Sequence, residues 1–302
     1  MNARRLTPAG RRDSGTNAPP LPTLGELLDA WQDELAGWTV PPATAAAVAP
    51  SPRPLPRQVS AREADRLAAA PAGASYRRAW AALDPPGSVL DVGAGAGAAC
   101  VPLLGRTTAL TAVDTDPEML ALLARRAEAL AGKVALVRGS WPEAAPEAAP
   151  ADLVTCYNVV YGAADILPFL AALTASARRL VVVELTAEYP LAGLNDLWLR
   201  FHGRRPAGPA AGDLLRILAA MGISASHERW TRPAGAGQAS FAELTAVTTR
   251  RLGLPPERAG EVAAALLEDG ADPDRPADPV TERRDIVTIW WAGSAAGREF
   301  PD

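Results

Sequence analysis

Hydrophobic positions change their spacing after the first quarter of the chain. From residue 88 onward, short apolar runs alternate with segments in which apolar residues recur every three to four positions. The runs have the length of strands and the segments have the period of amphipathic helices, which predicts a parallel sheet with helices on both faces. Strands are expected at residues 88–92, 110–113, 134–137, 153–157, 180–185, 223–230 and 286–291. Helices are expected at residues 98–104, 117–131, 166–177 and 212–221, with a helical insertion at about 240–270 before the last strand.

The N-terminal part follows a different pattern. Thr23, with Glu26 three positions later, has the form of a capping box, and apolar residues follow it at helical spacing. A second helical region is expected at residues 61–83, interrupted by Pro71 and Gly73. The chain therefore divides into a tail expected to be disordered (1–22), a helical region with a linker at 41–56 (23–83), an α/β domain (84–293) and a C-terminal tail (294–302).

Composition narrows the class of protein. Of the 302 residues, 48% are hydrophobic, which is enough for a filled core, and the net charge of −4 disfavours a broad nucleic-acid surface. No apolar stretch approaches the roughly 18 residues of a membrane span, and the N-terminal arginines precede no apolar segment of a secretory signal, so we expect a cytoplasmic protein. Cys100 and Cys156 lie in apolar runs and are expected in the core, and no metal centre is expected.

A glycine-rich turn follows the first expected strand. The sequence SVLDVGAGAG at residues 88–97 puts small residues where a backbone can approach a ligand. Its G-x-G-x-G spacing differs from the G-x-G-x-x-G of dinucleotide-binding domains. Asp91 lies in the strand itself, where a carboxylate repels a pyrophosphate and attracts an ammonium group. Asp114 ends the next strand, where a carboxylate can accept hydrogen bonds from both hydroxyls of a ribose.

Two stretches, VLDVGAGAG at residues 89–97 and AVDTDPEML at residues 112–120, resemble the first motifs of the class I methyltransferases that use S-adenosylmethionine (SAM). The resemblance covers about residues 76–185 and the closing strands. It implies a Rossmann-like, three-layer α/β sandwich with a seven-stranded, mostly parallel sheet whose last strand is antiparallel. It also implies SAM as the methyl donor and S-adenosylhomocysteine (SAH) as the product. A nucleotide-dependent oxidoreductase is the alternative reading of the glycine turn.

The resemblance also implies positions for the parts of SAM. It puts the ribose at Asp114, with Thr115 beside the adenosine, and the methionine amino group near Asp91. The methionine part would be lined by the residues of the glycine turn, Gly93, Ala94, Gly95 and Gly97.

Two later segments add candidates to the same site. Ser140 stands where relatives often carry an acidic residue on the adenine amino group, and Trp141 either covers the adenine or packs on a surface loop. Asn158, at the end of the fourth expected strand, either contacts SAM or the acceptor or merely caps the turn.

The sequence assigns no catalytic residue. Methyl transfer is a displacement in which orientation supplies much of the acceleration, and a base is needed only where the acceptor must lose a proton. Two candidates are His202, expected in a loop after the fifth strand, and Tyr161, and each has a structural alternative. Further pocket candidates are Glu184, Glu188 and Tyr189, whereas His227 is interpreted as structural.

The acceptor has no signature of its own. Neither an Asn-Pro-Pro-Tyr sequence nor a Pro-Cys nucleophile of nucleic-acid methylation occurs, so we expect a small-molecule acceptor. The alternatives are an RNA methyltransferase, using Arg204, Arg205 and the tail arginines, and a SAM-binding protein without transfer activity. The segment at about 232–284 should leave the sheet on the ligand side, where it and the N-terminal helices could cover the acceptor. The oligomeric state has no signature either.

Overall fold

The computed structural model describes residues 21–38, 57–130, 132–204, 208–232, 240–278, 280 and 284–294. Most of the two expected tails and the whole linker at residues 41–56 lie outside the described residues.

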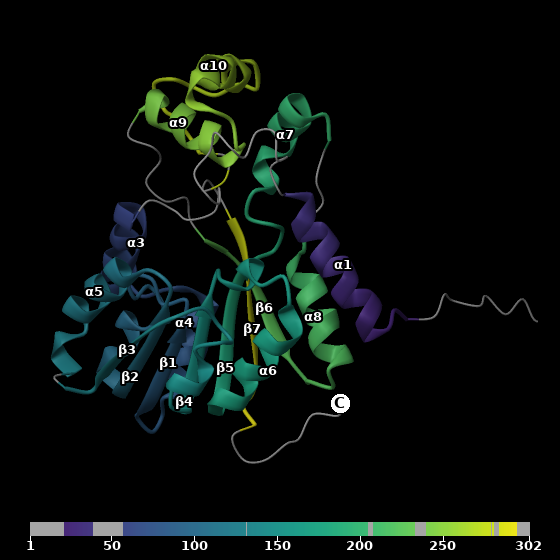
Figure 1. Ribbon diagram of the computed structural model, residues 1–302. Helices are drawn as coiled ribbons and strands as arrows, with labels where there is room; N and C mark the ends of the chain where they lie inside the picture. The colour runs from purple at the N-terminus through teal and green to yellow at the C-terminus, as the bar shows by residue number, and fades with distance from the viewer. Residues whose placement is uncertain are drawn as a thin grey trace, which may run out of the picture.

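Seven strands of the described residues form one sheet in the order β3-β2-β1-β4-β5-β7-β6 (Figure 1). The strands are β1 Gly87–Val92, β2 Thr107–Asp114, β3 Val134–Arg138, β4 Ala151–Tyr157, β5 Ala177–Thr186, β6 Ser226–Arg232 and β7 Arg284–Ala292. Neighbouring strands from β3 to β5 pair in parallel, and β7 pairs antiparallel with both β5 and β6. The predicted seven-stranded sheet with an antiparallel last strand is confirmed.

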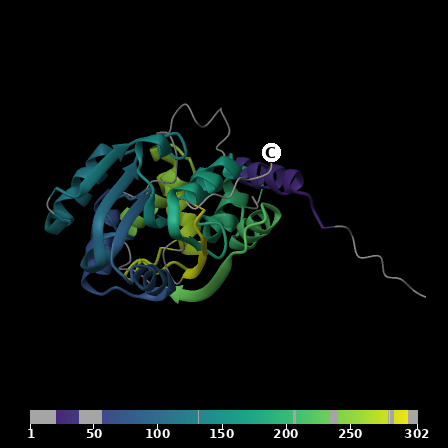
Figure 2. The same ribbon diagram turned by 90° about the horizontal axis from the view of Figure 1, so that it is seen from below.

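Helices cover both faces of this sheet and one of its ends. They are α1 Leu24–Gly37, α3 Arg57–Ala69, α4 Gly73–Ala82, α5 Pro117–Arg126, α6 Ile166–Ser176, α7 Asn195–His202, α8 Ala211–Ala220, α9 Phe241–Arg251 and α10 Ala259–Glu268. Helix α4 packs on β4, β5 and β7, and α5 packs on β2 and β3, whereas α6 packs on β4 and β5 and is joined there by α1. Seen from below, α1 (purple) lies at the rim of the molecule, beside α8 (Figure 2).

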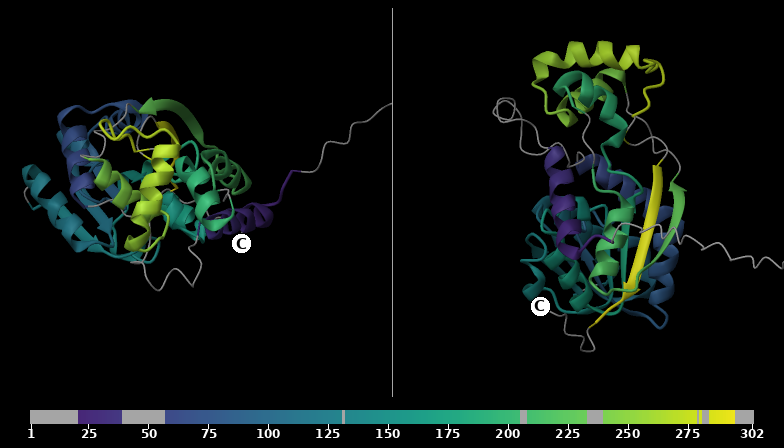
Figure 3. Two further views of the ribbon diagram at one scale, coloured as in Figure 1. Left: turned by 90° about the horizontal axis from the view of Figure 1, so that it is seen from above. Right: turned by 90° about the vertical axis from the view of Figure 1, so that its right-hand side faces the viewer.

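The insertion between β6 and β7 lies beyond the carboxyl ends of the parallel strands. Helices α9 and α10 pack on each other, and with α7 they stand above that end of the sheet in two perpendicular views (Figures 1 and 3). Because β6 runs in the same direction as β5, its carboxyl end delivers the chain to this side. The predicted position of the insertion is therefore confirmed.

Successive side chains of the central strands point to opposite faces of the sheet, and apolar side chains on both faces explain why helices cover both. In β4 and β5, Val154, Val181 and Val183 point into the core under α1, α6 and α8. Their neighbours Leu153 and Val182 point into the core under α4 and α5. All five are fully buried, as expected for inner strands of a parallel sheet. Cys100 and Cys156 are buried and free, so their predicted place in the core is confirmed.

Three local predictions were wrong. The segment 98–104 is not an α-helix: turns lead into a 3₁₀ helix, Val101–Arg106, because Gly97 has a left-handed φ of 94° and Pro102 lacks an amide proton. The helix predicted at 117–131 ends at Arg126 and continues as a short 3₁₀ turn. His202 does not lie in a loop but closes α7, a helix that the sequence analysis missed.

The N-terminal helix begins as predicted. Thr23 Oγ1 accepts a hydrogen bond from the amide of Glu26 (3.3 Å), and the Glu26 carboxylate accepts one from the amide of Thr23 (2.7 Å). Trp31, one of the apolar residues at helical spacing, is 1% exposed, and its indole Nε1 donates to the carbonyl oxygen of Ala163 (2.9 Å). Helix α1 is thus attached to the loop that follows β4.

Candidate functional site

The chain turns sharply where β1 ends. Gly93 and Gly97 have φ angles of 69° and 94°, in the left-handed region that favours glycine. A Cβ atom at Gly93 would lie 2.3 Å from Cγ2 of Val159, and one at Gly97 would lie 2.5 Å from Cγ2 of Val101. Both positions therefore need glycine, but for different reasons: Gly93 opens onto a pocket, whereas Gly97 makes room for the 3₁₀ segment.

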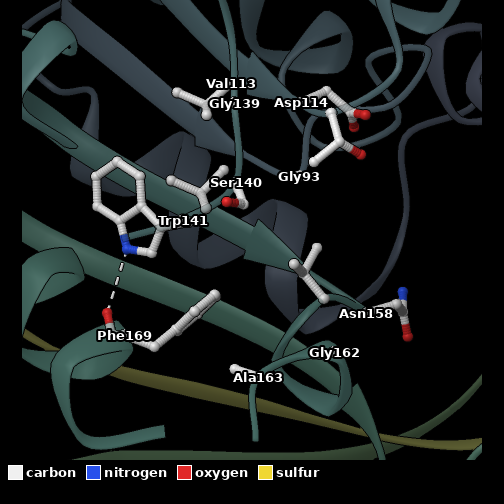
Figure 4. Close-up of a pocket in the computed structure, with 13 residues that line it drawn as sticks. Gly93, Val113, Asp114, Gly139, Ser140, Trp141, Asn158, Gly162, Ala163 and Phe169 are labelled. Atoms are coloured by element: carbon white, nitrogen blue, oxygen red, sulfur yellow. Dashed lines mark hydrogen bonds between the residues drawn. The ribbon is translucent and has the colours of Figure 1, made fainter. Parts of the chain in front are cut away.

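A pocket of about 340 Å³ lies at the carboxyl ends of β1, β2, β3 and β4 (Figure 4). It is lined by Val92, Gly93, Val113, Asp114, Thr115, Gly139, Ser140, Trp141, Asn158, Val159, Gly162, Ala163 and Phe169. Six of the ten residues expected to bind SAM are in this lining: Gly93, Asp114, Thr115, Ser140, Trp141 and Asn158. The other four, Asp91, Ala94, Gly95 and Gly97, are not among the lining residues.

Asp114 ties the glycine turn to the start of α5. Its Oδ2 accepts a hydrogen bond from the amide of Gly95 (2.8 Å), and its Oδ1 accepts one from the amide of Asp116 (2.8 Å). Asp116 in turn caps α5 by accepting from the amide of Glu118 (3.0 Å). A carboxylate has about four lone-pair directions, so these two bonds leave Asp114 able to accept from a ligand in the pocket.

Asp91 lies one layer below the pocket. It is 1% exposed, its Oδ1 accepts a hydrogen bond from the hydroxyl of Thr155 (2.8 Å), and its Oδ2 has no partner within the described part of the chain. Burial raises the pKa of Asp91 to about 6, and the thiol of Cys100 and the hydroxyl of Thr155 oppose that rise. A buried carboxylate with one unused oxygen beside a ligand-binding turn is able to bind a cation or a water molecule.

Two aromatic residues form one wall of the pocket. Trp141 is 8% exposed, and its indole Nε1 donates to the carbonyl oxygen of Phe169 (3.2 Å). Figure 4 shows these two side chains together on one side, with Asp114 across from them. Ser140 is exposed, and its hydroxyl donates to Glu143 (2.9 Å). The pocket therefore has an apolar, planar side and a polar side.

Asn158 joins the pocket to an ion pair between the buried Glu184 and the partly buried Arg232. It is the one non-glycine residue of the described chain with a left-handed φ (61°), and its amide donates to the carbonyl oxygen of Glu184 (2.7 Å). Its side-chain Nδ2 donates to Oε1 of Glu184 (3.3 Å), which also accepts from Arg232. Glu184 was a pocket candidate, but Arg232 was missed because 48 residues separate it from Glu184.

The two candidate catalytic residues are not brought to the pocket. The Tyr161 hydroxyl donates to the carbonyl oxygen of Thr186 (2.7 Å), and its ring lies parallel to that of Trp31. Burial raises the pKa of Tyr161. His202 is hydrogen-bonded through Nε2 to the carbonyl oxygen of Leu252 (2.8 Å), so its ring joins α7 to the end of α9. These contacts fit the structural alternative for both residues.

The remaining candidates are dispersed. Tyr189 is buried and stacks on Trp38 at a centroid distance of 4.8 Å, Glu188 is exposed, and His227 lies exposed on the outer strand β6. The pocket residues that sequence analysis missed are apolar or small, such as Phe169 and Ala163, and nothing in their local sequence distinguishes them from core residues. Among the described residues, no group of His, Cys, Asp and Glu is arranged to hold a metal ion.

Comparisons with known proteins address the class of this domain. A family model described as "Methyltransferase domain" matches residues 89–181. A search of curated proteins finds no match. Among solved structures, magnesium protoporphyrin IX methyltransferase from Synechocystis PCC 6803 with bound SAH is 14% identical with a TM-score of 0.45, over 76% of this chain and 83% of that chain. The plantazolicin methyltransferase BpumL in complex with SAH is 13% identical with a TM-score of 0.45, over 89% of this chain and 99% of that chain.

The sheet order and the pocket at the carboxyl ends of the parallel strands define a Rossmann-like domain with a ligand site beside its glycine turn. The family match begins in β1 and ends in β5, so it covers the strands that border the pocket. Residues 89–181 therefore match a methyltransferase domain, and this match supports a transferase that uses SAM. No helix of the described residues is both long and apolar enough to cross a membrane.

Proposed function

We propose that the protein transfers the methyl group of SAM to a small-molecule acceptor, and that the pocket at the ends of β1–β4 holds the adenosine half of SAM. The observation that carries this proposal is the pairing of Asp114 with Gly93 on one side of the pocket and of Trp141 with Phe169 on the other. A nucleoside has the same division, with a polar ribose and a flat base.

The pocket residues fit the adenosine in detail. Asp114 would accept hydrogen bonds from the ribose hydroxyls, as carboxylates at this strand end do in nucleotide-binding domains. Trp141 and Phe169 would contact the base, with Ser140 and Thr115 supplying hydroxyl groups at the rim. A Cβ at Gly93 would be driven into Val159, so the bare backbone there is what keeps this end of the pocket open.

The methionine end of SAM would lie over the glycine turn, toward Asn158. Asp91 would attract its ammonium group, directly or through a water molecule, because Oδ2 is buried and has no partner in the described residues. When bound, SAM supplies an electrophilic methyl group on a sulfonium. The role of the chain is to hold that methyl group and the acceptor in line and to exclude water.

Helices α7, α9 and α10 would cover the acceptor, since they stand above the strand ends where the pocket opens. The net charge of −4 supports a small molecule over an RNA. Salt-sensitive RNA binding would support an RNA acceptor instead, and SAM binding without turnover on any acceptor would support a binding protein. The cytoplasmic location stays a prediction from the sequence.

Calorimetry tests the donor site. The wild-type protein should bind SAM and SAH, and it should not bind NAD. Asp114→Ala should weaken both by about tenfold or more, the loss of hydrogen bonds to a charged group. Asp269→Ala, which removes an exposed carboxylate at the end of α10, is the control. A folded wild-type protein that fails to bind SAM, or that binds NAD instead, would overturn the proposal.

A further inference from the structure

A polar cluster around the buried Glu184 adjoins the pocket on the side away from the aromatic wall, and its other members are partly buried or exposed. Glu184 lies two residues before the end of β5 and is 3% exposed, and its Oε1 accepts hydrogen bonds from Asn158 (3.3 Å) and from Arg232. Tyr157 is the partner of Glu184 across the parallel pair β4–β5, so the two side chains leave the sheet on the same face. The cluster consists of Glu184, Arg232, Asn158 and Tyr157, and Asn158 also lines the pocket.

Hydrogen bonding within the cluster is incomplete. The hydroxyl of Tyr157 and the Nε of Arg232 are buried and have no partner in the described residues. Both hydrogen bonds to Glu184 fall on Oε1, which leaves its Oε2 without one in the same part of the chain. Buried polar groups in folded proteins are nearly always satisfied, so unused groups gathered at one place indicate a missing partner.

The ion pair has no evident value for folding. The side chain of Glu184 is 4% exposed and that of Arg232 is 18% exposed, and the desolvation of two such charges offsets much of their attraction. Arg232 reaches Glu184 on β5 from the outer strand β6, across β7, although the antiparallel ladders already hold these strands together. A carboxylate held by Asn158, which lines the ligand pocket, is instead suited to contact a substrate.

The charges around the cluster indicate the chemical class of the acceptor. Glu184 and Asp91 are two buried carboxylates, and Arg232 is the cation paired with one of them. Burial raises the pKa of Tyr157, the two carboxylates raise it further and Arg232 opposes that rise, so the Tyr157 hydroxyl stays neutral beside these charges. The free Oε2 and the Tyr157 oxygen are acceptors, which match the N–H groups of an amine better than they match an anion.

We propose that this cluster is the acceptor subsite and that the acceptor presents an amine, which donates its N–H groups to Glu184 Oε2 and to Tyr157. This inference rests on the proposed function. Arg232 is the positioning residue: it holds the Glu184 carboxylate in place. Its unused Nε would be satisfied by an oxygen atom near the amine of the same acceptor.

The chemistry balances with the groups present. An acceptor ammonium gives one proton to Glu184, which passes it to water, and the neutral nitrogen then attacks the methyl carbon in line with the departing sulfur. The new N–C bond forms as the S–C bond breaks, and the electron pair of that bond stays on sulfur in SAH. The product is a methylated ammonium, and the net release is one proton.

The test uses SAM labelled in its methyl group, the full-length protein and a deproteinised small-molecule extract of the source organism. The wild-type protein should place the label in a product that binds a cation exchanger at neutral pH and resists mild base, as a methylated amine does. Label in a base-labile methyl ester, in a product not retained by the exchanger, or in no product would overturn the proposal.

Variants separate the acceptor subsite from the donor site. Tyr157→Phe removes a hydroxyl that has no partner in the described residues, so a purely structural role predicts no loss of stability. Our proposal predicts instead that the apparent KM for the purified acceptor rises about tenfold, which is the effect of one hydrogen bond. Glu184→Gln should lower kcat by at least about tenfold through loss of the base. Calorimetric SAM affinity should change less than about twofold in both, by the additivity of separate sites.

Glu128→Gln, which neutralises an exposed carboxylate in the 3₁₀ turn after α5, is the matched control and should leave KM and kcat unchanged. Equal loss of SAM affinity and acceptor affinity in Tyr157→Phe would overturn the proposal, since the cluster would then hold the methionine end of SAM. Failure of the proposed function itself appears separately, as loss of SAM binding by the wild-type protein.

Discussion

The indole Nε1 of Trp31 in α1 donates a 2.9 Å hydrogen bond to the carbonyl oxygen of Ala163, a residue that lines the pocket at the strand ends. The ring of Trp31 also stacks on Tyr161 in the same loop, with an angle of 6° between the ring planes. A helix that precedes the methyltransferase domain in sequence thus supports one wall of its pocket.

Replacing this hydrogen bond should weaken SAM binding. Trp31→Phe keeps an aromatic ring but removes the donor, and the loss of one such bond costs about 1 kcal/mol, which corresponds to a roughly fivefold rise in the Kd for SAM measured by calorimetry. Trp38→Phe is the matched control, because Trp38 is equally buried and its Nε1 has no partner in the described chain. An equal rise in Kd for both variants would show that ring packing, and not the hydrogen bond, supports the pocket.

A methyl group at Gly93 should close the pocket. In Gly93→Ala the new Cβ would lie 2.3 Å from Val159 Cγ2, so the Val159 side chain must move. We expect the Kd for SAM to rise more than about tenfold relative to a variant that carries only the strain of an alanine at a left-handed φ. Gly203→Ala isolates that strain, since Gly203 has nearly the same φ (68° against 69°) and no atom within 4 Å of its would-be Cβ. SAM affinities that match between the two variants would contradict this account.

The charge of Asp91 should destabilise the folded protein at neutral and higher pH while it strengthens the binding of SAM. Because burial raises its pKa to about 6, the folded state holds this proton more tightly than the unfolded state does. The stability that Asp91 contributes is therefore present below about pH 4 and is lost as the pH rises through about 6. At about pH 8, Asp91→Asn should raise the free energy of unfolding by on the order of 3 kcal/mol, and near pH 4 it should have little effect.

Urea denaturation at the two pH values measures that difference, and calorimetry measures the accompanying effect on SAM. The same substitution removes the charge expected to attract the ammonium of SAM, so SAM affinity at about pH 8 should fall even though the protein is more stable. If Asp91→Asn gains stability and keeps full affinity for SAM, then Asp91 does not take part in binding SAM.

The sequence predicted those parts of the molecule whose signal is local. Buried strands carry continuous apolar runs, and Asp91, Gly93 and Asp114 lie in two short motifs at the ends of β1 and β2 whose spacing is typical of one ligand chemistry. The aromatic and small pocket residues, such as Phe169 and Ala163, are indistinguishable from core residues until the fold brings them together.

The features that the sequence did not predict depend on contacts between distant residues or on local signals that oppose each other. The Glu184–Arg232 pair depends on a strand order in which β7 enters between β5 and β6, which no local pattern encodes. The segment after Gly97 has apolar residues at helical spacing, but Pro102 and the left-handed Gly97 restrict it to turns and a 3₁₀ helix.

His202 shows how a plausible catalytic residue takes a structural place. Its Nε2 donates to the carbonyl oxygen of Leu252 (2.8 Å), and its ring lies 4.7 Å from that of Trp198, so it fastens the end of α7 to the end of α9. His202→Ala should lower the free energy of unfolding by about 1–2 kcal/mol, through loss of a hydrogen bond and of ring packing. His202→Gln, which retains a donor, should recover part of that loss in thermal denaturation. The pH dependence of methyl transfer per folded molecule should be the same in both variants as in the wild type. A rate of methyl transfer that falls while the free energy of unfolding is unchanged would instead indicate that His202 contacts the acceptor.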